Sequence, residues 1–128
     1  MIKSSVVFLP VSDIQKTYAF YHDLLGLEVA QKQGDNLYIF DTGYGYWGFC
    51  AYGDGRKILS GPQGVCLSLN VENKEEVQKM WESLEGKCLG YKEPQQHPIF
   101  PVYSCFVLDP DGYLVEFQKI TDETQPLK

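Results

Sequence analysis

The sequence predicts an α+β protein built from two βαβββ modules, each with a curved mixed sheet and one helix. The first half of the chain repeats in the second half at a constant offset of 60 residues, as Leu9 and Leu69 show (69 − 9 = 60). Each half reads as a strand, an amphipathic helix and further short strands separated by turn residues. The corresponding pairs are Val6 and Cys66, Leu9 and Leu69, Val11 and Val71, Asp13 and Asn73, Tyr21 and Trp81, Leu24 and Leu84, and Gly26 and Gly86.

The first module is expected over residues 5–53. Residues 5–11 alternate as a strand, and Pro10 favours an edge or strand-end position. The stretch Ser12-Asp13-Ile14-Gln15 has the spacing of a capping box, so a helix should begin there and end at Gly26. Three short strands are predicted after it, at residues 27–31, 36–41 and 46–52.

The second module is expected over residues 64–120. Asn73 is predicted to cap its helix, and Glu76 has the reciprocal spacing. The turn Asp109-Pro110-Asp111-Gly112 joins the last two strands, because proline presets φ and glycine tolerates the exit geometry. Ahead of that turn we predict a strand at 87–92, a proline-containing loop at 93–101 and a strand at 102–108.

Composition favours one cytoplasmic domain over residues 1–128. The apolar runs are too short for a signal peptide or a membrane span. Because no span is predicted, a membrane is not an expected partner; a formal net charge of −6 repels phosphate backbones, so nucleic acid is not expected either. The four cysteines show no C-x-x-C spacing, which favours reduced thiols over a zinc site or disulfides.

Two motifs carry a resemblance to a known family. They are Val11-Ser12-Asp13 followed by Phe20-Tyr21-His22-Asp23-Leu24-Leu25-Gly26-Leu27, and Asp109-Pro110-Asp111-Gly112-Tyr113-Leu114-Val115-Glu116. With the repeat, they make the chain resemble the vicinal oxygen chelate superfamily of glyoxalases, extradiol dioxygenases and bleomycin-resistance proteins. The resemblance implies a ligand cavity between curved sheets, but a shared scaffold does not dictate chemistry.

The resemblance also implies four metal-ligand positions, usually filled by His, Gln or Glu. They fall here on Val6, Cys66, Glu116 and one residue of the strand at 46–52. Neither residues 4–11 nor residues 42–53 contain His, Gln or a carboxylate. Because a divalent ion needs at least three good protein ligands in such a site, we expect no metal and no other cofactor.

The predicted ligand-binding residues gather on the strand faces around Glu116, the best candidate for an anionic anchor or an acid/base. Cys66, Ser68 and Asn70 share one strand face by alternation. Trp47 and Phe49 could form an aromatic platform, with ordinary core packing as the equally open alternative. His97 lies on the longest irregular loop, where a lid or a base for Cys105 would belong. The ligand-binding set is Phe8, Trp47, Phe49, Cys66, Ser68, His97, Tyr103, Leu114, Glu116 and Gln118.

These features favour a metal-independent small-molecule binding protein over a standard metal-dependent glyoxalase or dioxygenase. The ligand is expected to be planar or cationic, held in an aromatic, mildly acidic cavity. The similarity to bleomycin-resistance-type proteins implies a homodimer. The alternative is a lyase, isomerase or dioxygenase-like enzyme that uses Glu116 as acid/base or a non-standard metal at Cys66 and Glu116. A structural or regulatory partner domain is a third possibility.

Overall fold

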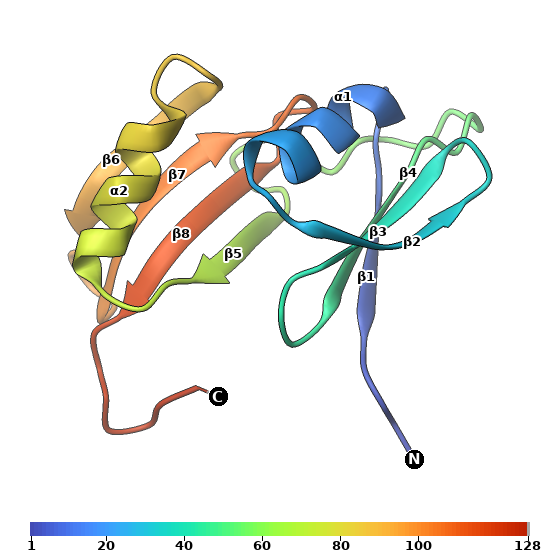
Figure 1. Ribbon diagram of the computed structural model, residues 1–128. Helices are drawn as coiled ribbons and strands as arrows, with labels where there is room; N and C mark the ends of the chain where they lie inside the picture. Colours follow the sequence, from blue (N-terminus) through green and yellow to red (C-terminus); the bar gives the residue numbers. More distant parts are fainter. Residues whose placement is uncertain (128) are drawn as a thin grey trace. The chain divides into compact units, whose positions relative to one another are not determined.

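The computed structural model describes residues 1–127, and the chain forms two compact units, Met1–Pro62 and Gln63–Lys128. Each unit has one four-stranded mixed sheet with helical structure on one face (Figure 1). This confirms the α+β class and the two βαβββ modules. The module limits 5–53 and 64–120, and the reading of the whole chain as one domain, stay predictions.

The first unit has the strand order β1-β4-β3-β2, in which β1 is parallel to β4 and the other pairs are antiparallel. Pro10 ends the edge strand β1, where its missing N–H costs no ladder bond. The elements are β1 Val6–Pro10, α1 Ile14–Tyr18, η1 Ala19–Leu24, β2 Glu28–Gln33, β3 Leu37–Asp41 and β4 Tyr46–Cys50.

The helical segment of this unit begins one residue later than the capping-box spacing predicted. Asp13, and not Ser12, is the N-cap, since its Oδ1 accepts from the N–H groups of Gln15 at 3.0 Å and Lys16 at 3.2 Å. The last turns of the segment, η1, widen to π-helix. Gly26 then ends the segment at φ 77°, as predicted.

An aromatic cluster fills the space between η1 and its sheet. The Tyr21 ring is fully buried and stacks on Phe49 at 4.3 Å between centroids. Phe40, also fully buried, lies 5.8 Å from Tyr21, and Trp47 meets Tyr21 edge-on at 6.2 Å. Such ring pairs contribute about 0.5–1.5 kcal/mol each beyond the area that they bury. The cluster therefore fastens η1 to β3 and β4.

The second unit repeats this arrangement, with the strand order β5-β8-β7-β6 and β5 parallel to β8. Helix α2 packs on one face of the sheet (Figure 1), and Asn73 caps it by accepting from the Glu76 N–H at 2.9 Å. The elements are β5 Cys66–Asn70, α2 Lys74–Leu84, β6 Leu89–Gln96, β7 Val102–Leu108 and β8 Leu114–Ile120.

Strand β6 is longer than predicted, and the loop expected from residue 93 begins only after Gln96. Pro94 was the signal for the loop, but β6 is an edge strand whose register shifts between Lys92 and Gln95. Proline is tolerated at bulges on edge strands, because no ladder bond requires its missing N–H there. The strand therefore continues through Pro94.

The predicted turn between β7 and β8 is confirmed. The Gly112 N–H donates to the Asp109 carbonyl at 3.0 Å, and Gly112 has φ 87°. Asp109 is 5% exposed, and its Oδ1 accepts from the N–H groups of Asp111 and Tyr113, both at 2.9 Å. One buried carboxylate thus organises the hairpin that carries Glu116. Within residues 1–127, the structure contains no helix of the length and apolarity that a membrane crossing requires.

Candidate ligand-binding face of the second sheet

Glu116 lies on the helix-free face of the second sheet, which we define as the face opposite α2. Its partner across the β7–β8 ladder is Phe106, while the neighbouring pair Cys105 and Phe117 points the other way. Cys105 is fully buried, and its Sγ donates to the Val77 carbonyl of α2 at 3.8 Å, so that pair marks the helix side. Because strand side chains alternate, Glu116 faces away from α2.

The register of β5 against β8 brings predicted site residues into neighbouring pairs. Cys66 lies opposite Leu114, Ser68 opposite Glu116, and Asn70 opposite Gln118. The Ser68 hydroxyl donates to Glu116 Oε1, and Gln118 Nε2 donates to Asn70 Oδ1 at 3.0 Å. Alternation in two strands that are 48 residues apart therefore builds one continuous polar surface.

Glu116 is half-buried, and no Lys, Arg or His side chain in the described part of the chain forms an ion pair with it. Ser68 satisfies only Oε1, which leaves Oε2 as an acceptor for a ligand. A half-buried carboxylate with one fixed oxygen and one available oxygen is suited to a cationic or hydrogen-bond-donating group.

The Cys66 thiol completes this cluster, with its Sγ 3.7 Å from Ser68 Oγ. Burial is the largest influence and raises the pKa of the Cys66 thiol; the Ser68 contact lowers it by a smaller amount, and the Glu116 charge raises it by a still smaller one. A raised pKa keeps the thiol protonated near neutral pH, and the thiol form is a weak nucleophile. Cys66 is therefore suited to contact a ligand and poorly suited to attack one.

Phe106 and Asn70 join the helix-free face but were not in the predicted ligand-binding set. Phe106 pairs directly with Glu116, and its ring is half-buried. The alternation of the predicted strand 102–108 could have identified it, since Phe106 and Ser104 share a face and Cys105 takes the other. Without the pairing of β7 with β8, the sequence did not show which of the two faces met Glu116.

Tyr103 lies away from this face, and His97 lies in the turn between β6 and β7. The Tyr103 ring is on the helix side, with Lys74 Nζ of α2 5.5 Å from its centroid. His97 Nδ1 accepts from the N–H groups of Ile99 at 3.1 Å and Phe100 at 3.0 Å, so it shapes the turn between β6 and β7. The pairing of His97 with Cys105 is not supported, because Cys105 is buried against α2.

In the first unit, Trp47 and Phe49 contact Tyr21 and belong to the aromatic cluster on the helix side. Phe8 lies on the opposite face, where its ring covers Gly48: a Cβ at Gly48 would come within 2.5 Å of the ring. Core packing therefore accounts for Trp47 and Phe49, and of the three only Phe8 lies on a helix-free face.

The internal repeat now identifies the strand position that the sequence left open. Phe8 pairs with Gly48 as Ser68 pairs with Glu116, so Gly48 is the first-module counterpart of Glu116. The four positions implied by the resemblance are then Val6, Gly48, Cys66 and Glu116, of which two offer a donor atom. Within residues 1–127, no cluster of three or more His, Cys, Asp or Glu side chains is arranged to hold a metal ion. The donor set does not fit a divalent ion that needs three protein ligands.

A shallow hollow of about 310 Å³ lies on the helix-free face of the first sheet. None of its lining side chains carries a charge, and Tyr46 is the one among them with a phenol. Because this hollow lacks a counterpart of Glu116, it offers no carboxylate to anchor a cation. The lining residues are Ser4, Ser5, Val6, Ala30, Gln31, Ile39 and Tyr46.

Cys105 gives this unit a pH-dependent stability. Burial raises the pKa of the Cys105 thiol to about 11, with a smaller contribution from the Glu116 charge. The unfolded chain therefore releases this proton at lower pH than the folded chain does, so stability falls as pH rises from about 9 toward 11. Chemical denaturation across that range should show a shallower decline in Cys105→Ala than in the parent protein. Parallel declines in the two proteins would contradict this assignment.

The profile of the Glyoxalase/Bleomycin resistance protein/Dioxygenase superfamily matches residues 3–117, and the chain belongs to this superfamily. A lactoylglutathione lyase from Agrobacterium tumefaciens is 21% identical, with TM-score 0.75 and coverage of 96% of this chain and 97% of that one. A glyoxalase-related enzyme from Fulvimarina pelagi is 18% identical, with TM-score 0.77 and coverage of 100% and 94%.

A superfamily protein from Alicyclobacillus acidocaldarius is 15% identical, with TM-score 0.76 and coverage of 94% of this chain and 93% of that one. Identities at this level show a shared fold and carry no assignment of substrate. A search of curated protein sequences found no match.

Proposed function

We propose that this chain is a metal-independent small-molecule binding protein that holds a planar or cationic ligand against the helix-free face of its second sheet. Glu116 is the anchor, and Phe106 offers a ring beside it. The observation that carries the proposal is the Glu116 carboxylate, held by Ser68 through Oε1 and without a protein cation in the described residues.

Electrostatics support this choice of ligand. Desolvating a carboxylate is costly unless a charge or hydrogen-bond donor compensates it. A cation placed at Oε2 supplies that compensation and lies next to Phe106, whose π face also attracts cations. The net charge of −6 further favours cationic over anionic ligands. Val6 and Gly48 carry no side-chain atom that could bind a metal, so these positions give no corresponding support to a metal-dependent reaction.

The test is a fluorescence titration with proflavine, a planar aromatic cation, against the parent protein and Glu116→Gln. The substitution keeps the side-chain shape and removes the charge. We expect the Kd to rise roughly tenfold to a hundredfold, because hydrogen bonds to charged groups contribute about 1.5–3 kcal/mol.

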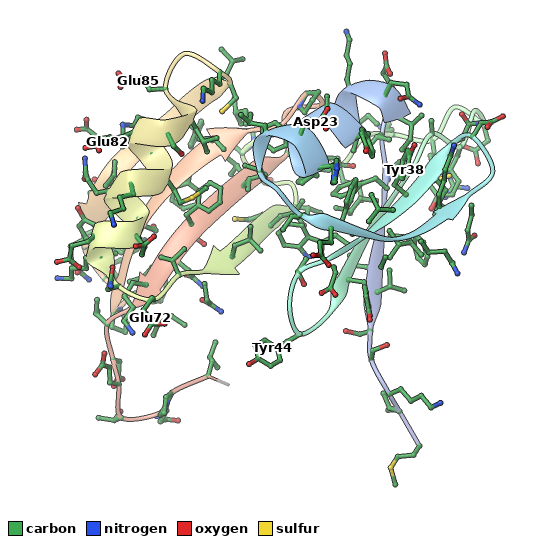
Figure 2. The ribbon with its side chains drawn as sticks, in the orientation of Figure 1. Asp23, Tyr38, Tyr44, Glu72, Glu82 and Glu85 are labelled. Atoms are coloured by element: carbon green, nitrogen blue, oxygen red, sulfur yellow. The ribbon has the colours of Figure 1, made fainter. Side chains whose placement is uncertain are left out.

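Glu85→Gln is the matched control, since it removes the same charge from the surface of the same unit. Glu85 projects from the end of α2 on the helix side of the sheet, and Glu82 projects nearby (Figure 2). The Kd of Glu85→Gln for proflavine should equal that of the parent protein. Equal weakening in both variants would show a general charge effect and reject the Glu116 site, as would the absence of proflavine binding. Stoichiometric nickel binding that requires Cys66 and Glu116 would favour the enzymatic alternative.

A further inference from the structure

The helix-free face of the second sheet is graded in polarity along its strands. The pairing of β5, β8, β7 and β6 places side chains in three rows that cross all four strands, and the pair Val102 and Ile120 follows beyond them on β7 and β8 alone. We name the three rows by their character. The apolar row contains Cys66, Leu114, Leu108 and Leu89; the carboxylate row contains Ser68, Glu116, Phe106 and Lys92; the amide row contains Asn70, Gln118, Ser104 and Gln95.

The apolar row has side chains that a ligand can reach. Leu89 is 71% exposed, and Leu108 and Leu114 are half-buried. Cys66 extends the row at its other end, and its raised pKa keeps the thiol neutral. Neutral, partly exposed apolar side chains gain free energy when an apolar group covers them, about 25 cal/mol per Å² buried.

The carboxylate row carries two charges, the Glu116 carboxylate on β8 and the Lys92 ammonium at its β6 end. Lys92 ends this row on the edge strand β6, where its Nζ lies 6.0 Å from the Tyr91 ring centroid and forms no ion pair with Glu116. The negative charge of Glu116 is therefore not cancelled within its own row.

The amide row offers both donors and acceptors. Gln118 Nε2 donates to Asn70 Oδ1, which orients both carboxamides. This bond leaves the Asn70 NH₂ group as a donor and Gln118 Oε1 as an acceptor. A carboxamide on a ligand has the complementary pair, so the row can bind it through two hydrogen bonds.

The spacing of the rows sets the length of the ligand. Adjacent rows lie two residues apart along β5, β8 and β7, which corresponds to about 6.6 Å, so the three rows span roughly 13 Å. On β6 the row members are three residues apart, because the register shifts between them. A compact planar cation covers one or two rows, whereas an elongated molecule can reach all three.

We infer that the ligand is an elongated amphipathic amine that lies along the strands. Its apolar group covers the apolar row, its protonated nitrogen meets Glu116, and its amide-like end binds Asn70 and Gln118. This inference rests on the proposed function and adds the orientation and chemical class of the ligand. Charge complementarity at Glu116 fixes the middle of the molecule, and the two unlike rows fix which end lies where.

The test uses three probes. The full probe is a linear secondary amine with a phenyl group on one arm and a primary carboxamide on the other, with each arm matched in length to one row spacing. The two truncated probes lack either the phenyl group or the carboxamide. Calorimetric titration measures each probe against the parent protein, Leu114→Ser, Gln118→Leu and Glu116→Gln, after thermal unfolding has shown that the variants fold.

Each substitution is expected to weaken only the probes that carry the group contacted by the replaced side chain. Leu114→Ser should weaken the full probe about tenfold and leave the probe without phenyl unchanged, because only the phenyl arm covers the apolar row. Gln118→Leu should weaken the full probe severalfold and leave the probe without carboxamide unchanged. Glu116→Gln should weaken all three probes, because all carry the amine.

The other outcomes separate the two proposals. If no probe binds while proflavine does, the inference fails and the proposed function stands. If Glu116→Gln binds proflavine and all three probes as the parent does, both the proposed function and the inference fail. If binding requires Glu116 but Leu114→Ser and Gln118→Leu affect the full and truncated probes equally, the row assignment alone is rejected. Probe affinity that falls as protein concentration rises would assign the face to a second copy of the chain and would also overturn the inference.

Discussion

Replacing Phe49 by alanine is expected to lower the free energy of unfolding by about 3–5 kcal/mol, the usual cost of deleting a buried aromatic side chain. The Phe49 ring is fully buried and stacks on Tyr21 at 4.3 Å, so the substitution removes a central contact between η1 and β4. Urea denaturation followed by tryptophan fluorescence measures the effect, since Trp47 contacts the same Tyr21 ring.

Phe49→Leu is the control for this prediction, because it keeps most of the apolar volume and should lose clearly less stability than Phe49→Ala. Ligand binding per folded molecule should be the same in both variants, since Phe49 does not lie on the helix-free face. If Phe49→Ala kept parent-like stability and lost proflavine binding, the platform interpretation would be right and the core assignment wrong.

Replacing Asp109 by alanine is expected to cost roughly 2–6 kcal/mol, because it removes the Oδ1 acceptor of the N–H groups of Asp111 and Tyr113 and each such loss costs about 1–3 kcal/mol. The hairpin positions β8, so proflavine affinity should also fall. Thermal and chemical unfolding measure the first effect, and fluorescence titration measures the second.

Asp109→Asn separates the role of the acceptor from that of the charge. It retains an oxygen at Oδ1 and should therefore keep more of the stability than Asp109→Ala does. An exposed carboxylate on α2, Glu82, provides the surface reference, for which substitution by alanine should change stability by less than about 0.5 kcal/mol (Figure 2). If Asp109→Ala and Glu82→Ala had the same effect, the two bonds at Asp109 Oδ1 would not stabilise the turn.

Local chemistry and the repeat were sufficient to predict most of the fold. The sequence at residues 109–112 predicted a turn that the structure confirms, and Asn73 caps α2 as its residue type predicted. The repeat holds in the strand pairing itself, where Phe8 with Gly48 corresponds to Ser68 with Glu116, although the offset is 60 residues in the first strands of the two modules (68 − 8 = 60) and 68 in the last (116 − 48 = 68). These features depend on neighbours in sequence or on comparison of the two halves.

Which face of a strand receives the helix was harder to predict. Alternation correctly placed Trp47 and Phe49 on one face and Tyr46 on the other, but both faces carry aromatic rings, and apolar content could not distinguish them. The same ambiguity applies to β7, where the structure places Phe106 on the helix-free face and Tyr103 on the helix side. The face is decided by long-range packing against Tyr21 and α2, which no short sequence window contains.

The Phe8 ring over Gly48 constrains how this chain could change over evolutionary time. Any side chain at position 48 would begin with a Cβ 2.5 Å from that ring, so a carboxylate cannot be introduced there unless Phe8 moves or shrinks first. A smaller residue at position 8 gives the site no ligand by itself, and it uncovers the sheet at Gly48. A carboxylate at position 48 therefore requires the Phe8 ring, which is 44% exposed, to turn aside or to be replaced by a smaller side chain, so the effects of substitutions at positions 8 and 48 depend on each other.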